Sequence, residues 1–261
     1  MRQALADLLH HRELLWTIAY RDVRIKYKQS IMGFLWALLM PLLIVLAGVI
    51  VRYGYSVLSN TPLRVTDIAA VAVKSVPWAF FVSTVRFATS SLIGNVNLVT
   101  KIYFPREIFP IATVISNLFD FIVASCALTV LLALAGIKVG LEALWLPVIF
   151  VVLVSLCLGV GFFVSAASLF FRDVKYIVEV FLTFGIFFTP VLYTTDMIGS
   201  AREYILLNPV APVLESIEFV IVRGRAPDLP WLGYSAAVGL VLLLFGFRFF
   251  KRVEPAFAER I

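Results

Sequence analysis

Six long apolar runs, separated by polar segments, constrain this sequence more than any other feature. Three of the runs contain no charged residue, and three contain one each, namely Arg86, Asp120 and Glu179. The runs cover residues 31–51, 75–100, 108–137, 143–171, 176–195 and 229–247. A helix rises 1.5 Å per residue, so about 20 apolar residues cross the roughly 30 Å of hydrocarbon in a bilayer. Helices also satisfy their own backbone groups in lipid, and the sequence therefore predicts an all-α integral membrane protein with six transmembrane helices.

The composition fits a chain whose main solvent is lipid. Of the 261 residues, 62% are hydrophobic and 15% are charged, against about 25% charged in a typical soluble domain. The net charge of +6 is expected to meet anionic membrane lipid. The chain has no long basic tail and no alternation of basic and aromatic residues of the kind that binds nucleic acid. We therefore expect membrane lipid, and no nucleic acid, as a partner.

Lysine and arginine are divided unequally between the two sides that six crossings would define. Fourteen of the 22 fall on the side of the termini and seven on the other, while Arg86 lies inside a run. Positive residues favour the cytoplasmic side, so both termini are expected in the cytoplasm. The predicted organisation is a cytoplasmic interface segment, 1–30, followed by one six-helix membrane domain, 31–261, which ends in a cytoplasmic tail, 248–261.

The segment 14–30 is too polar to cross the membrane but has the pattern of an amphipathic helix. At 100° per residue, Trp16, Tyr20, Val23 and Tyr27 form one stripe, with charged residues on both sides of it. Such a helix can lie among the lipid headgroups, either as a plain anchor or as a surface that meets a partner or a lipid-linked substrate. Its candidate interface residues are Arg21, Asp22, Arg24, Lys26, Tyr27 and Lys28.

Two further segments interrupt the apolar pattern. Residues 95–107 form a short, charged stretch between the second and third runs, on the cytoplasmic side, where a protein partner can bind it. Residues 204–222 are long enough to cross, but two prolines break them. We expect two re-entrant half-helices that line a cavity, with an amphipathic surface helix as the alternative. The residues singled out in this re-entrant segment are Asn208, Pro209, Pro212 and Glu215.

Charged residues within the runs are candidates for function, because they are costly in lipid. Arg86 and Asp120 lie in the middle of neighbouring runs, and we expect them to pair, while Glu179 lies near the cytoplasmic end of its run. Aromatic residues are the second candidate group: Phe181, Phe184 and Phe188 share one face of the fifth run. They either contact lipid and protein, as most membrane aromatics do, or line a path for sugar rings.

The sequence carries no pattern that would make this chain an enzyme. Phosphate-binding loops, dinucleotide fingerprints, zinc-protease motifs and nucleophile elbows are all missing. Cys126 and Cys157 lie in apolar runs and are expected to be small hydrophobic residues, and the adjacent His10 and His11 do not share a helix face. We therefore expect no catalytic, cofactor or metal site. Six helices close poorly around a wide hole, so a transport path is expected between two copies of the chain.

Four blocks of the sequence resemble the membrane subunit of type-2 ABC exporters, in the order that the family has them. They are RDVRIKYKQSIMGFLWALLMPL (21–42), NLVTKIYFPREIFPIATVISNLFDF (97–121), FRDVKYIVEVFLTFGIFFTPVLY (171–193) and LNPVAP (207–212). The resemblance covers nearly the whole chain and is strongest to the branch that exports polysaccharide, including O-antigen, teichoic acid and capsule.

The resemblance implies a homodimeric permease in the bacterial inner membrane, driven by two separate ATPase subunits that bind ATP and Mg²⁺. The cargo would be an undecaprenyl-linked, O-antigen-like polysaccharide; alternatives are a drug or simple lipid on the same architecture, or an intramembrane glycosyl- or acyltransferase. Family precedent makes 95–107 the coupling segment that docks on the ATPase, through Asn95, Asn97, Lys101, Tyr103, Arg106 and Glu107. It also places aromatic residues along the channel, here Trp36, Phe181, Phe184, Phe188 and Tyr193.

Overall fold

The computed structural model describes residues 10–28, 33, 35–101 and 104–257, and every regular element among them is a helix. Five of these helical segments are long and apolar enough to cross a membrane. They are built on α3 (Leu35–Ser59), α4 (Val65–Ser91), α6 (Ile108–Leu134), α7 (Leu146–Phe170) and α11 (Leu229–Val253). The chain is therefore a multi-pass membrane protein, as its sequence predicts.

The remaining helices are shorter and lie around this bundle. They are α2 (Arg12–Tyr27), α5 (Val96–Lys101), α8 (Val174–Gly185), α9 (Arg202–Leu206) and α10 (Val210–Ile221). Single 3₁₀ turns cover Ile93–Asn95, Leu141–Trp145, Thr195–Met197, Gly199–Ala201 and Glu254–Ala256.

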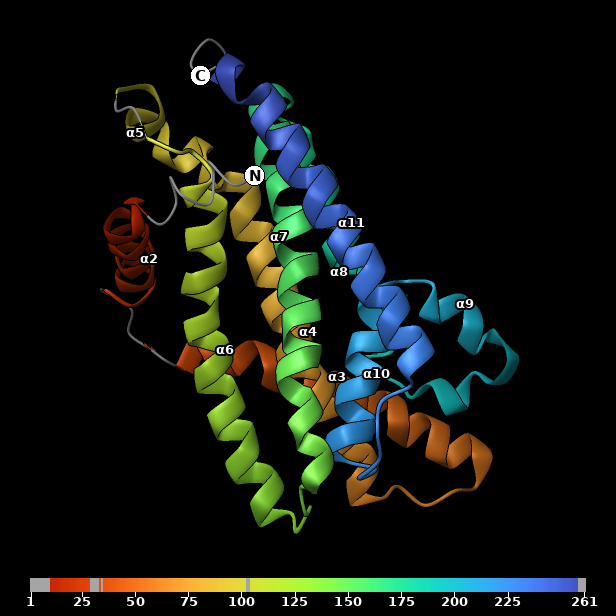
Figure 1. Cartoon of the computed structure of the whole chain (residues 1–261). Coiled ribbons are helices and arrows are strands. Elements are labelled where there is room, and N and C mark those ends of the chain that lie inside the picture. Colours follow the sequence, from red (N-terminus) through yellow and green to blue (C-terminus); the bar gives the residue numbers. More distant parts are fainter. Residues whose placement is uncertain (1–9, 29–32, 34, 102–103, 258–261) are drawn as a thin grey trace.

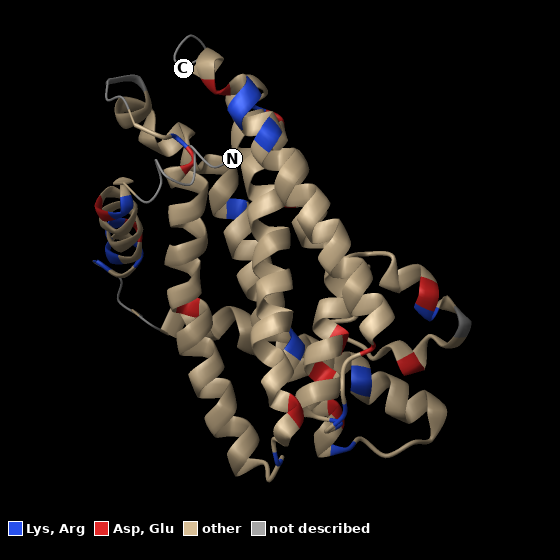
Figure 2. Ribbon diagram, in the orientation of Figure 1, with Lys and Arg blue, Asp and Glu red and all other residues tan. Residues whose placement is uncertain are grey.

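The long helices give the bundle two distinct ends (Figure 1). The ends of α4, α7 and α11 and the start of α6 lie together at one end, beside α5, which we name the α5 end. The α3–α4 connection, residues 135–145 and the connection from α10 to α11 lie toward the opposite end, which we name the α10 end. Lys and Arg residues occur near both ends of the ribbon, with few between them (Figure 2).

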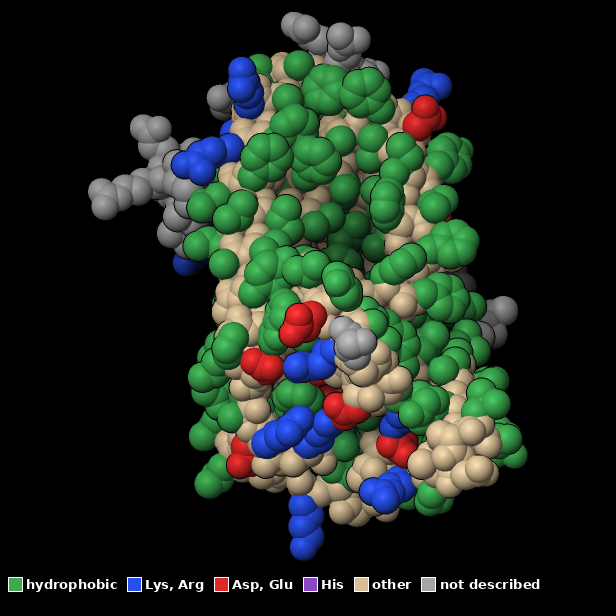
Figure 3. Space-filling model, turned by 90° about the vertical axis from the view of Figure 1, so that its right-hand side faces the viewer, with side chains coloured by type: hydrophobic (Ala, Val, Ile, Leu, Met, Phe, Trp, Pro, Cys, Tyr) green, Lys and Arg blue, Asp and Glu red, His purple; other side chains and the backbone are tan. Residues whose placement is uncertain are grey.

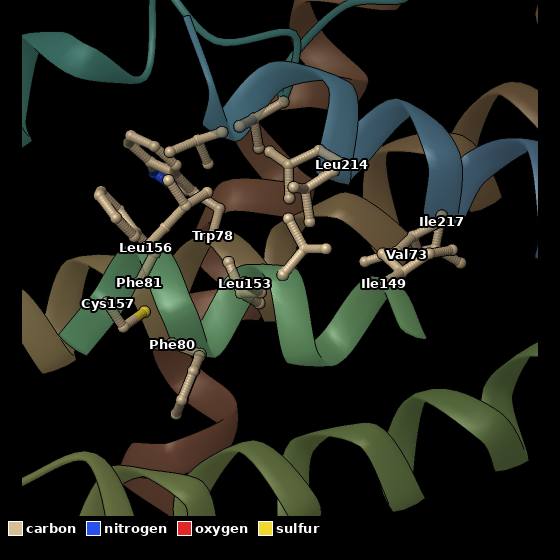
Figure 4. Close-up of a cluster of buried hydrophobic side chains, with 14 of the residues drawn as sticks. Val73, Trp78, Phe80, Phe81, Ile149, Leu153, Leu156, Cys157, Leu214 and Ile217 are labelled. Atoms are coloured by element: carbon tan, nitrogen blue, oxygen red, sulfur yellow. The ribbon is translucent and has the colours of Figure 1, made fainter. Parts of the chain in front are cut away.

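Helix α4 is the central element of the fold, and α3, α6, α7, α8 and α10 all pack against it. Its aromatic side chains meet aliphatic side chains of α7 and α10 in a buried cluster (Figure 4). Trp78 is 4% and Phe80 3% exposed, and Leu153 and Leu214 from the facing helices are fully buried. A helix that is apolar nearly all round is best placed at the centre of a bundle, and this is where α4 lies.

Glycines let α7 approach its neighbours closely. A β-carbon on Gly159 would lie 2.6 Å from backbone atoms of Leu242 and Leu243 in α11, and one on Gly161 would lie 3.4 Å from the β-carbon of Ala88 in α4. Small residues at such contacts are the usual means of tight packing between membrane helices. A side chain at Gly159 would therefore prevent this close contact between α7 and α11.

Several helix boundaries differ from the predicted runs. Helix α4 begins at Val65 and α3 continues to Ser59, so Lys74 and Arg52, which lie just outside the predicted runs 75–100 and 31–51, are inside helices. The fifth run, 176–195, is helical only as far as Gly185; the 12 residues of α8 span about 18 Å. Tight turns follow, so this run does not form the continuous membrane-spanning helix that we predicted.

The proline-broken segment forms two short helices, α9 and α10, as predicted. Helix α10 is buried along nearly its whole length, with Glu215 3% and Glu218 2% exposed. It packs against α4, α7 and α11. This burial rules out the alternative of an amphipathic helix on the surface.

Candidate transport and coupling sites

Two aromatic residues of α8, and one in the turns that follow it, line a large cavity. Phe181, Phe184 and Phe188 are 74%, 56% and 72% exposed and border a space of about 680 Å³. Trp78 and Phe81 of α4 form part of its wall, as do Asn208 and Pro209 from the start of α10. The structure therefore brings three predicted pathway residues together with two residues of the predicted re-entrant segment.

The side-chain amide of Asn208 joins two parts of this cavity wall. The Asn208 side chain donates hydrogen bonds to the Phe188 carbonyl oxygen at 3.1 Å and to Thr189 Oγ1 at 2.9 Å. Its own carbonyl oxygen accepts from the backbone N–H of Val210 at 3.1 Å, at the first turn of α10. Asn208 thus fixes the start of α10 against the turn that follows α8. The third predicted residue, Pro212, is buried within α10.

Trp36 lies in a different cavity from the α8 aromatics. It is 50% exposed and borders a space of about 440 Å³ between α2, α3, α4 and α6, together with Lys26, Arg86 and Asp120. Trp78 lies between the two cavities and borders both. Within one chain, the predicted pathway is therefore divided into two spaces.

The predicted pairing of Arg86 with Asp120 is wrong. Arg86 of α4 binds Glu179 of α8 through two hydrogen bonds, of 2.7 and 2.9 Å. Asp120 of α6 instead accepts a hydrogen bond from Lys26 of α2 at 3.1 Å and one from the Tyr27 hydroxyl. The two residues lie on adjacent helices, but Arg86 points toward α8, whereas Asp120 points toward α2.

Helix α2 docks on α6 through a face that includes Tyr27 but not the other aromatic residues of its stripe. Ile18 and Ala19 are its buried residues, whereas Trp16 and Tyr20 are 63% and 67% exposed. Lys26 completes the contact by donating to Asn117 Oδ1 at 2.7 Å, beside its bond to Asp120. Trp16 and Tyr20 are therefore left free to enter lipid.

The other predicted interface residues of α2 differ in their surroundings. Burial and the hydrogen bond to Asp120 raise the pKa of Tyr27, so this phenol stays a donor to the carboxylate. Arg21 and Asp22 pair with each other at 2.8 Å. Arg24 and Lys28 are exposed and available to lipid headgroups or a partner.

The predicted coupling segment begins with exposed helix and ends in buried contacts. Helix α5 is six residues long and presents Asn97 to solvent, while Asn95 caps the preceding turn by donating to the Ser91 carbonyl at 2.8 Å. The side chain of Lys101 and all of Tyr103 lie outside the described residues.

Two residues that we expected on the docking surface have internal roles. Glu107 has no exposed surface and accepts a 2.6 Å hydrogen bond from Lys251 near the end of α11. Arg106 donates to the Glu254 carbonyl oxygen at 2.6 Å. A fully buried carboxylate cannot contact an ATPase, so the expectation that Glu107 docks directly on a partner is wrong.

Residues 193–197 form a polar hub toward the α10 end that the sequence analysis missed. The backbone carbonyl of Tyr193 accepts from Lys74 of α4 at 2.8 Å, and Thr194 accepts from Arg52 of α3 at 3.2 Å. Thr195 donates to Glu215 of α10, and Asp196 pairs with Arg223 at 2.6 Å. The hub therefore ties α3, α4, α10 and the segment that follows α10 to the turn after α8.

Buried ion pairs surround the hub. Lys74 and Glu218 are 1% and 2% exposed and lie 2.9 Å apart, and Arg223 binds the other oxygen of Glu218 at 2.7 Å. Burial raises the pKa of Glu218, but the charges of Lys74 and Arg223 outweigh it and hold the pKa below its usual range. The available sequence signal was the presence of Arg52 and Lys74 beside apolar runs, with polar Thr194 and Thr195 ending another.

Tyr193 belongs to this hub as well as to the predicted pathway. Its hydroxyl donates to the Phe187 carbonyl oxygen at 3.0 Å. This hydrogen bond links the turn at Phe187 to the hub at Tyr193. Its contacts in the described structure are with protein rather than with the cavity that α8 lines.

Comparison with known proteins identifies the family. The model of the ABC-2 type transporter family matches residues 13–222, which is most of the chain. The chain belongs to the ABC-2 type transporter family. The matched residues contain α5, the hub and nearly all of the residues that line the two cavities, so the features described above lie within or against the family's membrane domain.

Curated relatives add detail. The chain is 30% identical over 273 residues to a protein of Myxococcus xanthus named O-antigen export system permease protein RfbA, and the match covers 100% of both chains. It is 26% identical over 250 residues to a protein of the same name from Klebsiella pneumoniae, covering 95% of this chain and 94% of that protein. The relatedness of this ABC-2 permease thus extends beyond residue 222, through α11.

Proposed function

We propose that this chain is the channel-forming permease of an ATP-driven exporter of lipid-linked, O-antigen-like polysaccharide. The observation that carries the proposal is the exposed aromatic face of α8 beside the exposed Arg86–Glu179 pair. The names of the relatives from Myxococcus xanthus and Klebsiella pneumoniae support the choice of cargo. An undecaprenyl-linked glycan presents sugar rings, whose C–H faces stack on aromatic side chains.

The Arg86–Glu179 pair indicates which side of the chain meets the cargo. The two side chains are 41% and 50% exposed, although Arg86 lies within an apolar helix. Charged side chains at membrane depth face protein or water-filled cavities, because lipid solvates them poorly. The surface formed by α4 and α8 is therefore placed along a polar path, and the α8 aromatics border the neighbouring cavity, which shares Trp78 with the cavity that Arg86 borders.

A second copy of the chain completes this path. The described helices leave α3 and α8 largely uncovered: Trp36, Leu46 and Phe181 are all at least half exposed. The face that holds α9 and α11 is hydrophobic and hollowed toward the α5 end and charged toward the α10 end (Figure 3). Two copies related by a twofold axis would enclose a channel between them, with the same helices on both sides.

The proposed orientation has the α5 end in the cytoplasm and the α10 end outside the inner membrane. The chain crosses six times, because α8 and its following turns carry it from the end of α7 to the hub. Helices α9 and α10 re-enter from the outside and close the path there. Two ATPase subunits, which bind ATP and Mg²⁺, dock at α5 and the exposed part of α2.

An export assay tests the cargo and the path together. In cells that lack the chromosomal copy, the double variant Phe181→Ala/Phe184→Ala should lower the surface polysaccharide detected by antibody, while its lipid-linked form accumulates inside. Phe245→Ala is the control, since Phe245 is a 59% exposed phenylalanine on α11. Unchanged export by the double variant would remove α8 from the path, and a deletion strain with normal surface polysaccharide would overturn the proposed cargo.

Purification in mild detergent tests the ATPase partner. We expect a chain with a phosphate-binding loop to co-purify with the wild type and to be lost from Asn97→Glu/Lys101→Glu. The control Lys138→Glu reverses an exposed charge just beyond the other end of α6 and should retain the partner. If no nucleotide-binding chain accompanies the folded wild type, the exporter proposal fails.

A further inference from the structure

The end of α11 is bound to the start of α6 by a set of contacts that we name the C-terminal tie. Lys251 donates to Glu107 at 2.6 Å and to Glu254 at 3.0 Å. Arg106 donates to the carbonyl oxygen of Glu254 at 2.6 Å, and to Val99 O in α5 at 3.3 Å. The tie thus joins Arg106 and Glu107 to the end of a distant helix, and Arg106 also links it to the middle of α5; Arg106 and Glu254 are 148 residues apart in the sequence.

Aromatic packing reinforces the tie. Phe257 is fully buried, stacks edge-on against Phe250 at 5.2 Å and lies 5.8 Å from the guanidinium carbon of Arg106. Phe104, just before the tie, packs edge-on against Phe109 at 5.5 Å in the same cluster. Aromatic side chains in and beside the start of α6 and the end of α11 therefore pack against the polar contacts.

The buried carboxylate makes the tie resistant to rearrangement. Glu107 is fully buried, and its Oε1 has no hydrogen-bond partner within the described residues, while Lys251 supplies the charge that compensates its other oxygen. Separation of a buried ion pair leaves an uncompensated charge in the protein interior, which is strongly unfavourable. The start of α6 and the end of α11 are therefore expected to move together.

Helix α11 passes any such movement to α7. The two helices form the most extensive helix pair in the described part of the chain, and Gly159 brings their backbones together. Helix α7 leads after three residues into α8, which carries the aromatic face. Packed interiors are dense and deform little, so a displacement at Glu107 has a continuous route through α11 and α7 to α8.

We propose that Lys251 and Glu254 are positioning residues that make the end of α11 part of the coupling unit with α5. In an exporter that works as proposed above, ATPase motion at α5 then reaches α8 through α11 as well as through α4 and α6. The inference rests on the proposed function, but a loss of partner binding and a loss of coupling are separate outcomes in the test that follows.

Distance measurements in the complete permease–ATPase complex test whether the unit is rigid. Spin labels are placed at the exposed positions 97 and 252, with a second pair at 97 and 138 for comparison, in a Cys126→Ser background; Cys157 is buried. We expect nucleotide to change the 97–138 distance and to leave the 97–252 distance unchanged. A nucleotide-dependent 97–252 distance, or no change in either pair, would overturn the proposal.

Transport stoichiometry tests whether the tie matters for coupling. In the reconstituted complex, Lys251→Met should retain the ATPase partner and ATP hydrolysis but lower the polysaccharide exported per ATP by at least about fivefold, the lower end of usual coupling effects. Lys251→Arg keeps the charge and should restore export. A wild-type amount of polysaccharide exported per ATP in Lys251→Met contradicts the proposal. If this variant does not fold, the spin-label distances described above, measured without a change at Lys251, decide whether the proposal holds.

Discussion

Lys74 and Glu218 are both almost completely buried, but they do not depend on each other equally. Glu218 also binds Arg223, whereas Lys74 retains only the carbonyl oxygen of Tyr193 when its carboxylate partner is removed. Breaking a buried ion pair usually costs about 3–5 kcal/mol, because the remaining charge is left without compensation. Removing Glu218 is therefore expected to cost more stability than removing Lys74.

We expect Glu218→Gln to lower the melting temperature of the detergent-solubilised protein more than Lys74→Met does. The double variant Lys74→Met/Glu218→Leu should be more stable than Glu218→Gln alone, since it leaves no unpaired lysine. Thermal unfolding followed by circular dichroism measures all three. Equal losses for the two single variants would show that Arg223 does not compensate Glu218.

The Glu218 carboxylate is also expected to make the stability of the fold depend on pH. Burial opposes its ionisation, but the charges of Lys74 and Arg223 keep the pKa of Glu218 below its ordinary value of 4.5 in the folded protein. Its ionised form therefore stabilises the fold fully above pH 4.5, and this contribution is lost as the pH falls through the lower folded-state value. The melting-temperature difference between wild type and Glu218→Gln should be constant near neutral pH and shrink in acid.

The exposed Glu203 of α9 provides the control for this titration, and Glu203→Gln should match the wild type at every pH. A Glu218→Gln difference that persists unchanged to about pH 3 would contradict the lowered pKa, since acid should by then have protonated this carboxylate in the unfolded chain, where its pKa has the ordinary value of 4.5.

At the scale of elements, the α7–α11 contact depends on the absence of a side chain at Gly159. A β-carbon there would lie 2.6 Å from the α11 backbone, which cannot yield as a flexible side chain can. We expect Gly159→Ala to destabilise the protein by about 1–3 kcal/mol, the usual cost of overpacking. Gly233→Ala in α11 is the matched control, because a β-carbon there meets no atom within 4 Å.

Thermal unfolding in detergent measures both glycine variants. Gly233→Ala should be neutral or slightly stabilising, because alanine favours helix over glycine. If Gly159→Ala unfolds at the wild-type temperature, α7 and α11 are not held at the close distance described, and the route from the C-terminal tie to α8 loses its stiff link.

For the whole molecule, the orientation can be tested by cysteine labelling. In a Cys126→Ser background, a membrane-impermeant thiol reagent should label Lys138→Cys in intact spheroplasts and Asn97→Cys only in inverted vesicles. Arg252→Cys should behave as Asn97→Cys does, because the end of α11 and α5 lie at the same end of the bundle. Labelling of positions 97 and 138 from the same side would contradict the proposed topology.

The sequence alone determined the solvent of this protein and much of its local structure. Hydropathy and helical periodicity depend on neighbouring residues, so five long helices, the amphipathic α2 and the proline-broken α9–α10 segment could all be predicted. The ordered blocks of similarity pointed to the ABC-2 family. Gly185 and Pro190 within the fifth run were local signals that α8 would end early, but overall hydropathy concealed them.

Only the tertiary structure decided which charged groups meet. Arg86 pairs with Glu179 rather than Asp120, and Glu107 turns inward to Lys251, because helix rotation and tilt choose the facing surfaces. The hub at 193–197 likewise exists only where α3, α4 and α10 converge on one turn. A sequence records which residues lie on a helix, whereas the packing of the helices determines which of those residues face one another.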